Sequence, residues 1–331
     1  MKYRILALIT ALITVLTLLA GCGGSQKKEP ASGESGAAAD KKLQIVATIF
    51  PIYDWARAVA GDRAELTLLQ DNGADLHNYQ PTADDIVKLS QADVFIHVGG
   101  TSDQWVEKTL ASADNAKLIT VNLMDSLADR VKAEEVKDGM EAEEAEEEEE
   151  EVEYDEHIWL SLKNAATLVE RIAQACAEAD PAGKETYERN AEVYIDELTA
   201  LDTEYADAVS AAPVKTLVFG DRFPFRYLVD DYGLDYYAAF VGCSTESEAK
   251  IETRIFLANK IDELGLKHIM QIETARGDLA EEIRKATKTG DQTILTLNSM
   301  QSIGSDQVRD GATYLGFMRD NLDVLKEALS N

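Results

Sequence analysis

Residues 43–69 read LQIVATIFPIYDWARAVAGDRAELTLL, and this stretch decides the fold class. An apolar, β-rich run at 43–49 is followed by helical spacing at 52–60 and by a second strand-like run at 66–69. Strand, helix and strand in such close succession are typical of a parallel sheet, because parallel strands need a crossover connection. The stretch therefore predicts an α/β fold.

The alternation continues along the chain in two blocks. The first block predicts a helix begun by the capping-box-like pair Thr82 and Asp85, a helix at 105–111, and strands at 94–98 and 118–121. The second block predicts strands at 215–219, 236–241, 268–272 and 293–297, and helices at 225–231, 248–264, 279–286 and 308–329. Each block predicts a mainly parallel sheet flanked by helices.

A long helical pattern separates the two blocks. A helix is expected at 162–179, and Pro181 then opens a pattern that runs to about residue 211, since proline suits the first turn of a helix. A helix of that length reaches about 45 Å, which is longer than one small domain. We therefore predict two lobes joined by one long connecting helix, with a ligand site in the cleft between the lobes, where the carboxyl ends of the strands meet.

The predicted organisation has five parts. They are a signal peptide at 1–21, a lipid-anchored flexible linker at 22–42, an N-terminal lobe at 43–180 with an acidic insertion at about 132–153, the connecting helix at 181–212 and a C-terminal lobe at 213–331.

The composition is that of a folded but strongly acidic protein. Hydrophobic residues make up 45% of the 331 residues, and the formal net charge is −29. A surface this negative repels phosphate groups, so no nucleic-acid partner is expected. Six consecutive glutamates at 146–151 oppose helix formation by mutual repulsion. We interpret this acidic insertion as a solvated spacer that raises the local concentration of cations.

The first residues have the features of an export signal. Lys2 and Arg4 precede an uninterrupted run of apolar residues and threonines at 5–19, which has the length of a signal-peptide core. The run ends in LAGC, and this resembles a bacterial lipobox whose cysteine, Cys22, is lipidated; an ordinary signal peptide remains the alternative. Residues 23–40 lack large apolar side chains and predict a flexible tether.

Two further cysteines, Cys176 and Cys243, do not make a disulfide framework in a chain of this length. Cys243 could be a thiolate ligand, but a small buried hydrophobe is the favoured interpretation.

Two of the four histidines lie in polar segments where a cleft residue is expected. His77 lies in DLHNYQPT at 75–82, and His157 lies in DEHIWL at 155–160. Imidazole nitrogen suits zinc and its neighbours in the periodic table, and nearby carboxylates can orient the ring. Their spacing alone is no motif, so ordinary surface histidines remain an alternative. His97 and His268 lie in predicted strands and are interpreted as structural.

From about residue 43 to its C-terminus, the chain resembles the zinc/manganese solute-binding lipoproteins of bacterial ABC transporters. The likeness is carried by GADLHNYQPT at 73–82, YDEHIWL at 154–160, and Tyr227 with YGL at 232–234. The first two segments resemble the family's loops D-P-H-x-Y-x-P-T and D-P-H-x-W-L, whose histidines bind the metal. The resemblance thus implies His77 and His157 as ligands.

The sequence departs from the family pattern at the other ligand positions. Where the family usually has a third histidine, this chain has Arg222, which cannot bind a metal. Asp221 is the predicted substitute, because a carboxylate oxygen is an acceptable ligand, although it could instead cap the next helix. Asn298 stands near the family's fourth position and is a weak carbonyl ligand at best. Glu273 and Glu246 could reach the cleft but have no motif support.

The predicted function is capture of a divalent transition metal without chemistry. His77 and His157 would hold the ion and Asp221 would close over it. Zn²⁺ is the first choice, with Mn²⁺ or Fe²⁺ as alternatives. The resemblance implies that an ABC transporter permease and its ATPase receive the ion, and that the protein is an extracytoplasmic monomer held to the cell membrane by lipid on Cys22.

Two other classes of function remain as rivals. A surface-anchored zinc hydrolase would need an open coordination position and a general base, and Glu156 beside His157 could be that base. The sequence contains no H-E-x-x-H pair, nucleophile elbow or phosphate loop, so we do not expect an enzyme. The second rival is an adhesin with the same fold.

Overall fold

A computed structural model describes residues 41–73, 75–141, 152–244, 248–275 and 278–330. The predicted signal peptide, the predicted lipidation site Cys22, the predicted linker up to residue 40, the glutamate run and Glu246 lie outside the described residues. Among the helices that are described, none is both long and apolar enough to cross a membrane.

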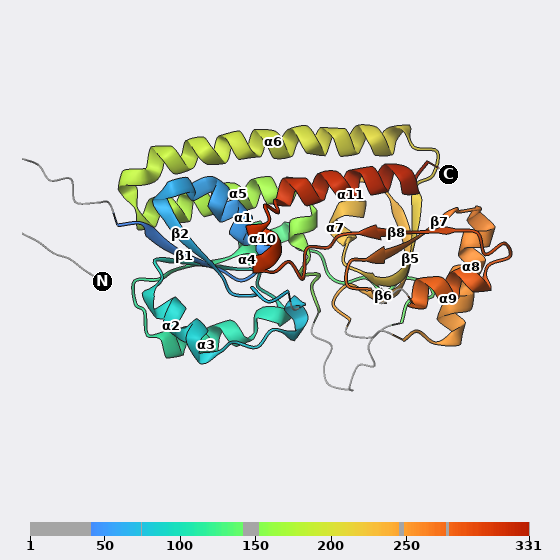
Figure 1. Cartoon of the computed structure of the whole chain (residues 1–331), viewed down its shortest axis with the longest axis horizontal. Coiled ribbons are helices and arrows are strands. Elements are labelled where there is room, and N and C mark those ends of the chain that lie inside the picture. The colour runs from blue at the N-terminus through green and yellow to red at the C-terminus, as the bar shows by residue number, and fades with distance from the viewer. Residues whose placement is uncertain (1–40, 74, 142–151, 245–247, 276–277, 331) are drawn as a thin grey trace, which may run out of the picture. The chain divides into compact units, whose positions relative to one another are not determined.

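The first lobe is built on a parallel four-stranded sheet. Its strands are β1 (Leu43–Ala47), β2 (Ala64–Leu68), β3 (Val94–His97) and β4 (Ile119–Asn122), in the order β2-β1-β3-β4. All four residues of β3 are buried, as expected for a strand covered on both faces. Figure 1 shows α1 (Phe50–Ala60) and α5 (Leu162–Ala179) on one face, and α2 (Ala83–Gln91) and α3 (Trp105–Ala113) on the other.

The second lobe repeats the same strand order. Its strands are β5 (Thr216–Phe223), β6 (Asp235–Val241), β7 (His268–Ile272) and β8 (Thr293–Leu297), all parallel, in the order β6-β5-β7-β8. The helices that pack on this sheet are α7 (Arg226–Tyr232), α8 (Ile251–Leu264), α9 (Asp278–Ala286) and α11 (Tyr314–Ala328). The predicted pair of parallel sheets flanked by helices is confirmed.

The predicted long helix is α6 (Lys184–Ala211), preceded by a short 3-10 turn, η6 (Pro181–Gly183). Figure 1 shows α6 beside α5 of the first lobe and α11 of the second. The helix buries Tyr187, Leu198, Leu201 and Tyr205. The Tyr205 hydroxyl donates to the Met318 carbonyl of α11 at 2.6 Å. The helix therefore packs against both lobes along its length and is more than a connection between them.

The predicted capping box at the start of α2 is confirmed. Thr82 Oγ1 accepts from the Asp85 backbone N–H at 3.3 Å, and Asp85 Oδ2 accepts from the Thr82 N–H at 2.8 Å. The Tyr79 hydroxyl donates to the same carboxylate oxygen at 2.8 Å. These bonds fix the chain directly after the first histidine-bearing loop.

The helix predicted at 308–329 is wrong as a single element. The structure has α10 (Ser305–Arg309) and α11 instead, and the break contains Gly311 with φ of 95°. Thr313 then caps α11 by accepting from the Gly316 N–H at 3.0 Å. A short helix that was not predicted, α4 (Leu123–Leu127), follows β4. The remaining short turns are η1 (Gly61–Arg63), η2 (Leu76–Asn78), η3 (Thr101–Asp103), η4 (Ala128–Arg130) and η5 (Ile158–Leu160).

Candidate metal centre

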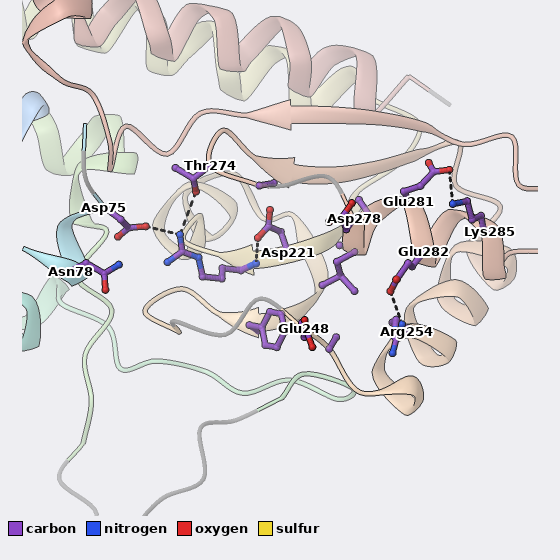
Figure 2. A pocket seen from close by; sticks show the side chains of 17 residues that line it. Asp75, Asn78, Asp221, Glu248, Arg254, Thr274, Asp278, Glu281, Glu282 and Lys285 are labelled. Carbon is purple, nitrogen blue, oxygen red and sulfur yellow. Dashed lines mark hydrogen bonds and ion pairs between the residues drawn. The ribbon is translucent and has the colours of Figure 1, made fainter. Parts of the chain in front are cut away.

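His77 lies in the turn η2, between β2 and α2. The turn forms because Asp75 Oδ1 accepts from the His77 backbone N–H at 3.1 Å, and Leu76 anchors it by burying its side chain in the core. The second carboxylate oxygen of Asp75 is 2.6 Å from the Arg222 guanidinium of the second lobe. Figure 2 shows this contact at the edge of a cavity. The His77 loop is thus bonded to both lobes.

His157 is fully buried just before η5. Asp155 Oδ1 accepts from the His157 backbone N–H at 2.8 Å and lies 2.9 Å from its Nδ1. The loop is tied to the second lobe on both sides. The Trp159 indole N–H donates to the Ser299 carbonyl at 2.8 Å, and the Tyr227 hydroxyl donates to the Asp155 carbonyl at 2.8 Å. These contacts give Tyr227 and Trp159, which the resemblance singled out, a positioning role.

The two rings face each other through their Nε2 atoms, which are 3.3 Å apart. The Nδ1 atoms are engaged elsewhere: that of His157 with Asp155, and that of His77 with Ser102 Oγ at 2.8 Å. Two nitrogens bound to one tetrahedral Zn²⁺ at about 2.05 Å would lie about 3.3 Å apart. The imidazole pair already has that spacing, so the residues present fit a zinc ion.

The two imidazoles differ in their affinity for protons. Burial lowers the pKa of His77, and a positive charge on His157 lowers it further. Burial alone would also lower the pKa of His157, but the Asp155 carboxylate outweighs it and the pKa is raised above its ordinary value. The pair therefore holds a proton more readily on His157 than on His77, and a bound ion would displace that proton.

Glu156 holds the backbone of Ser102, the residue that contacts His77. Its backbone N–H donates to Glu156 Oε1 at 2.7 Å, and Glu156 Oε2 lies 4.0 Å from His77 Nδ1. Burial raises the pKa of Glu156 to about 7. Ser102 was not predicted from the sequence, because its segment carries no motif.

Cys243 lies close to the two histidines and forms a group of three with them. Its Sγ and the ligating nitrogens of His77 and His157 all lie within 4.8 Å of one another. Its side chain is half-buried, and both interpretations of this cysteine, as a small buried hydrophobe and as a thiolate ligand, stay predictions. Burial raises the pKa of its thiol well above the ordinary value. A signal was available in the sequence, because Cys243 follows a predicted strand at its carboxyl end.

Asp221, the predicted third ligand, is not brought into this group. It lies within β5, and its two carboxylate oxygens accept from the backbone N–H groups of Arg222 at 2.8 Å and Ile272 at 3.1 Å. Burial raises its pKa. The alternative role as a helix cap is wrong, because the N-cap of α7 is Phe225. As a ligand, Asp221 stays a prediction.

The other predicted candidates have partners of their own. Glu273 accepts from the Ser299 N–H at 2.7 Å and from its hydroxyl at 2.8 Å. The Asn298 side chain accepts from the Met300 N–H at 2.8 Å. His97 is buried and lies beside Asp103, with 3.2 Å between its Nδ1 and the carboxylate, and its structural role stays a prediction.

Asp75 of the His77 loop belongs to the wall of a cavity of about 770 Å³, whose lining side chains are drawn in Figure 2. Asp75 and Asn78 of the first lobe line it together with Asp221 and Arg222 of the second. None of the three grouped residues, His77, His157 and Cys243, is among those that line it. The contact between Arg222 and Asp75 therefore lies at the border between this cavity and the His77 loop.

Comparison with known protein families gives a match over residues 45–328 to the family described as zinc-uptake complex component A, periplasmic (ZnuA). The chain belongs to this family. The predicted resemblance is confirmed, and the family is one of solute-binding proteins of ABC transporters that act outside the cytoplasm and are not enzymes. The hydrolase alternative is therefore not supported.

Named relatives and a solved structure resemble the chain over most of its length. The zinc-binding lipoprotein AdcA of Streptococcus pneumoniae is 34% identical over 87% of this chain and 56% of its own length. The high-affinity zinc uptake system protein ZnuA of Bacillus subtilis is 29% identical over 94% of each chain. The crystal structure of the Zn(II)-bound ZnuA-like domain of Streptococcus pneumoniae AdcA superposes with a TM-score of 0.69 at 31% identity, covering 88% of this chain and 100% of that domain. The chain thus spans little more than half the length of AdcA, and it corresponds to the ZnuA-like part.

Proposed function

We propose that this chain is the extracytoplasmic solute-binding component of a metal-ion ABC importer and that its substrate is Zn²⁺. The observation that carries the proposal is the pair of Nε2 atoms of His77 and His157, which face each other at 3.3 Å. This spacing suits two ligands of one zinc ion, and both rings are fixed through their other nitrogens. The names of the relatives, zinc-binding lipoprotein and zinc uptake protein, support the same substrate.

The proposed mechanism is capture followed by delivery. The site would bind Zn²⁺ without changing it chemically, and an ABC permease with its ATPase would receive the ion. Lipid on Cys22 would keep the protein, acting as a monomer, at the membrane beside that transporter. A single acyl chain binds membranes weakly, so durable anchoring would need two or more chains.

Removal of the imidazoles tests the metal site. We expect the full-length chain to bind one Zn²⁺ in competition with a chromophoric chelator. Loss of even an outer-shell partner typically costs 10–100-fold in metal affinity, so His77→Ala or His157→Ala should cost at least about 100-fold. His268→Ala is the matched control, because His268 lies at the start of β7, outside the group of three, and should leave affinity unchanged.

The same titration discriminates among metals. Two imidazoles also accept Mn²⁺ and Fe²⁺, which were the alternatives predicted from the sequence. Tighter binding of either of these ions than of Zn²⁺ would contradict the proposed substrate. A double histidine variant that still held one Zn²⁺ tightly would contradict the proposed site.

The anchor is tested by fractionation of cells that express the chain. Cys22→Ala should move the protein from the membrane fraction to the soluble fraction, because it removes the residue that would carry the lipid. Cys176→Ala is the control, because this buried cysteine of α5 is remote from the N-terminus in sequence and lies in the core. Retention of the Cys22→Ala protein on membranes would contradict the lipid anchor.

A further inference from the structure

The second lobe must supply a ligand that differs from the family pattern. The expected third histidine is absent, and Arg222, which stands in its place, bonds Asp75 at 2.6 Å. Asp221 is occupied by two backbone N–H groups. Protein-held zinc sites have at least three protein ligands, so a pair of histidines alone is incomplete.

We propose that Cys243 completes the site by binding the metal ion through its thiolate sulfur. The inference rests on the proposed function, since it names a further ligand for the same ion. It is based on position: among the described residues, Sγ of Cys243 and the ligating nitrogens of His77 and His157 form a group within 4.8 Å.

The backbone around Cys243 is fitted to the His157 ring. A Cβ atom at Gly242 would lie 3.0 Å from His157 Cε1 and 3.0 Å from the Phe223 carbonyl oxygen, closer than nine in ten such contacts. The absence of a side chain at 242 therefore lets this loop lie directly against the imidazole. The following residue, Cys243, is placed beside the ring as a consequence.

The same loop is held from two other directions. Glu134 Oε1 accepts from the Cys243 backbone N–H at 3.1 Å, and the Ser244 carbonyl accepts from Arg222 Nη1 at 3.1 Å. Arg222 in turn pairs with Asp75, which caps the His77 turn. The loop that carries the thiol is thus connected to the loops of both histidines.

The distances allow coordination with a small movement. In a tetrahedral site, with Zn–S of about 2.3 Å and Zn–N of about 2.05 Å, sulfur and nitrogen lie about 3.6 Å apart. Sγ lies within 4.8 Å of one ring nitrogen of each histidine, so an approach of up to about 1.2 Å brings it to the coordination distance from those nitrogens. A side-chain rotation or a small loop shift is sufficient for this.

A thiolate would also determine which metal is preferred. Sulfur ligands favour zinc, whereas carboxylate oxygen suits manganese better. Cys243 would therefore be a specificity-determining residue, selecting Zn²⁺ over Mn²⁺ more strongly than a carboxylate at the same point. Replacing Cys243 by aspartate should lower the ratio of Zn²⁺ to Mn²⁺ affinity by at least about tenfold.

Cobalt substitution tests the ligand directly. Co²⁺ occupies zinc sites, and a Co²⁺–thiolate bond gives a near-ultraviolet charge-transfer band. The full-length chain loaded with Co²⁺ should show this band, and Cys243→Ala should lose it together with at least about 100-fold of Zn²⁺ affinity. Cys176→Ala and Cys22→Ala, which change the other two cysteines, should keep the band.

The outcomes separate this inference from the proposed function. Stoichiometric Co²⁺ binding that depends on His77 but gives no charge-transfer band would overturn the role of Cys243 and leave the proposed function intact. A band that persists in Cys243→Ala would also overturn it, as would an unchanged metal ratio in Cys243→Asp. Absence of any stoichiometric Zn²⁺ or Co²⁺ binding would overturn both. The spectrum of the unaltered chain needs no variant, so a folding defect in Cys243→Ala cannot hide the result.

Discussion

The ion pair between Arg222 and Asp75 joins the two lobes beside the candidate metal centre. Arg222 Nη2 lies 2.6 Å from Asp75 Oδ2, and the two side chains are 12% and 14% exposed. Arg222→Met keeps much of the apolar length and removes the charge. The variant would leave the Asp75 carboxylate largely buried without its cation.

The loss in the free energy of unfolding that we expect for Arg222→Met lies between two limits. Breaking a fully buried pair costs about 3–5 kcal/mol, whereas an exposed pair contributes about 0–1 kcal/mol. At 12–14% exposure we expect Arg222→Met to lose about 2 kcal/mol of the free energy of unfolding at pH 7. Burial alone would raise the pKa of Asp75, but the charge and hydrogen bond of Arg222 outweigh it and the pKa is lowered. This contribution is present above the ordinary carboxyl pKa of about 3.9, and it should shrink as the pH falls below that value.

Urea unfolding of the metal-free protein, with a chelator present, measures this effect. Arg222→Met, Asp75→Asn and the double variant form a cycle, because Asp75 also caps the His77 turn and a single variant would mix the two roles. Arg309→Met is the control, since the pair formed by Arg309 with Asp306 is 71% and 84% exposed and should contribute nothing measurable. A coupling energy below about 0.5 kcal/mol would refute the reasoning.

Four further predictions concern the site and the acidic run. Ser102→Ala removes the Nδ1 partner of His77 and should lower zinc affinity about tenfold in chelator competition. Gly242→Ala places a methyl group against His157 and should destabilise the fold by about 1–3 kcal/mol in urea unfolding. Because the pKa of His157 is raised above its ordinary value of about 6.5, protons should compete with zinc at this ring already above that pH, and zinc affinity should fall as the pH is lowered through that range. Replacing the glutamates at 146–151 by glutamine should slow zinc association at low salt in stopped-flow measurements and leave the dissociation rate unchanged.

Most of the fold could be predicted because its signals are local. The bounds of α5, β7 and β8 agree with the sequence pattern, since buried parallel strands appear as short apolar runs and α5 carries a clear helical period. The single helix predicted at 308–329 was wrong for a physical reason. Apolar residues keep a helical period across the break, but Gly311 with positive φ and the Thr313 cap end one helix and start the next.

Only the site residues that stand in a recognisable local sequence motif could be predicted. His77 and His157 stand in polar loops that match a family pattern, and the structure brings them together. Asp221 was chosen by its spacing from later motifs, but β5 extends past it with a register shift between Phe219 and Arg222. That irregularity directs the Asp221 carboxylate to backbone N–H groups, and nothing in the sequence signals it. Cys243 lies 86 positions after His157 and 166 positions after His77 in the sequence. Only tertiary packing brings the three residues together.

The arrangement of cross-lobe contacts bears on how a bound ion would leave. Because α6 packs against helices of both lobes and α1 also contacts α11, a wide hinge opening would have to disrupt a buried helix layer. Just after β6, Glu134 holds the backbone N–H of Cys243 and Arg222 holds the carbonyl of Ser244. Rotating the Cys243 side chain away from the ion would remove the thiolate while the imidazole pair stays in place on the first lobe. We therefore expect release to begin with loss of the thiolate, which would leave a two-histidine site with far weaker affinity for the ion.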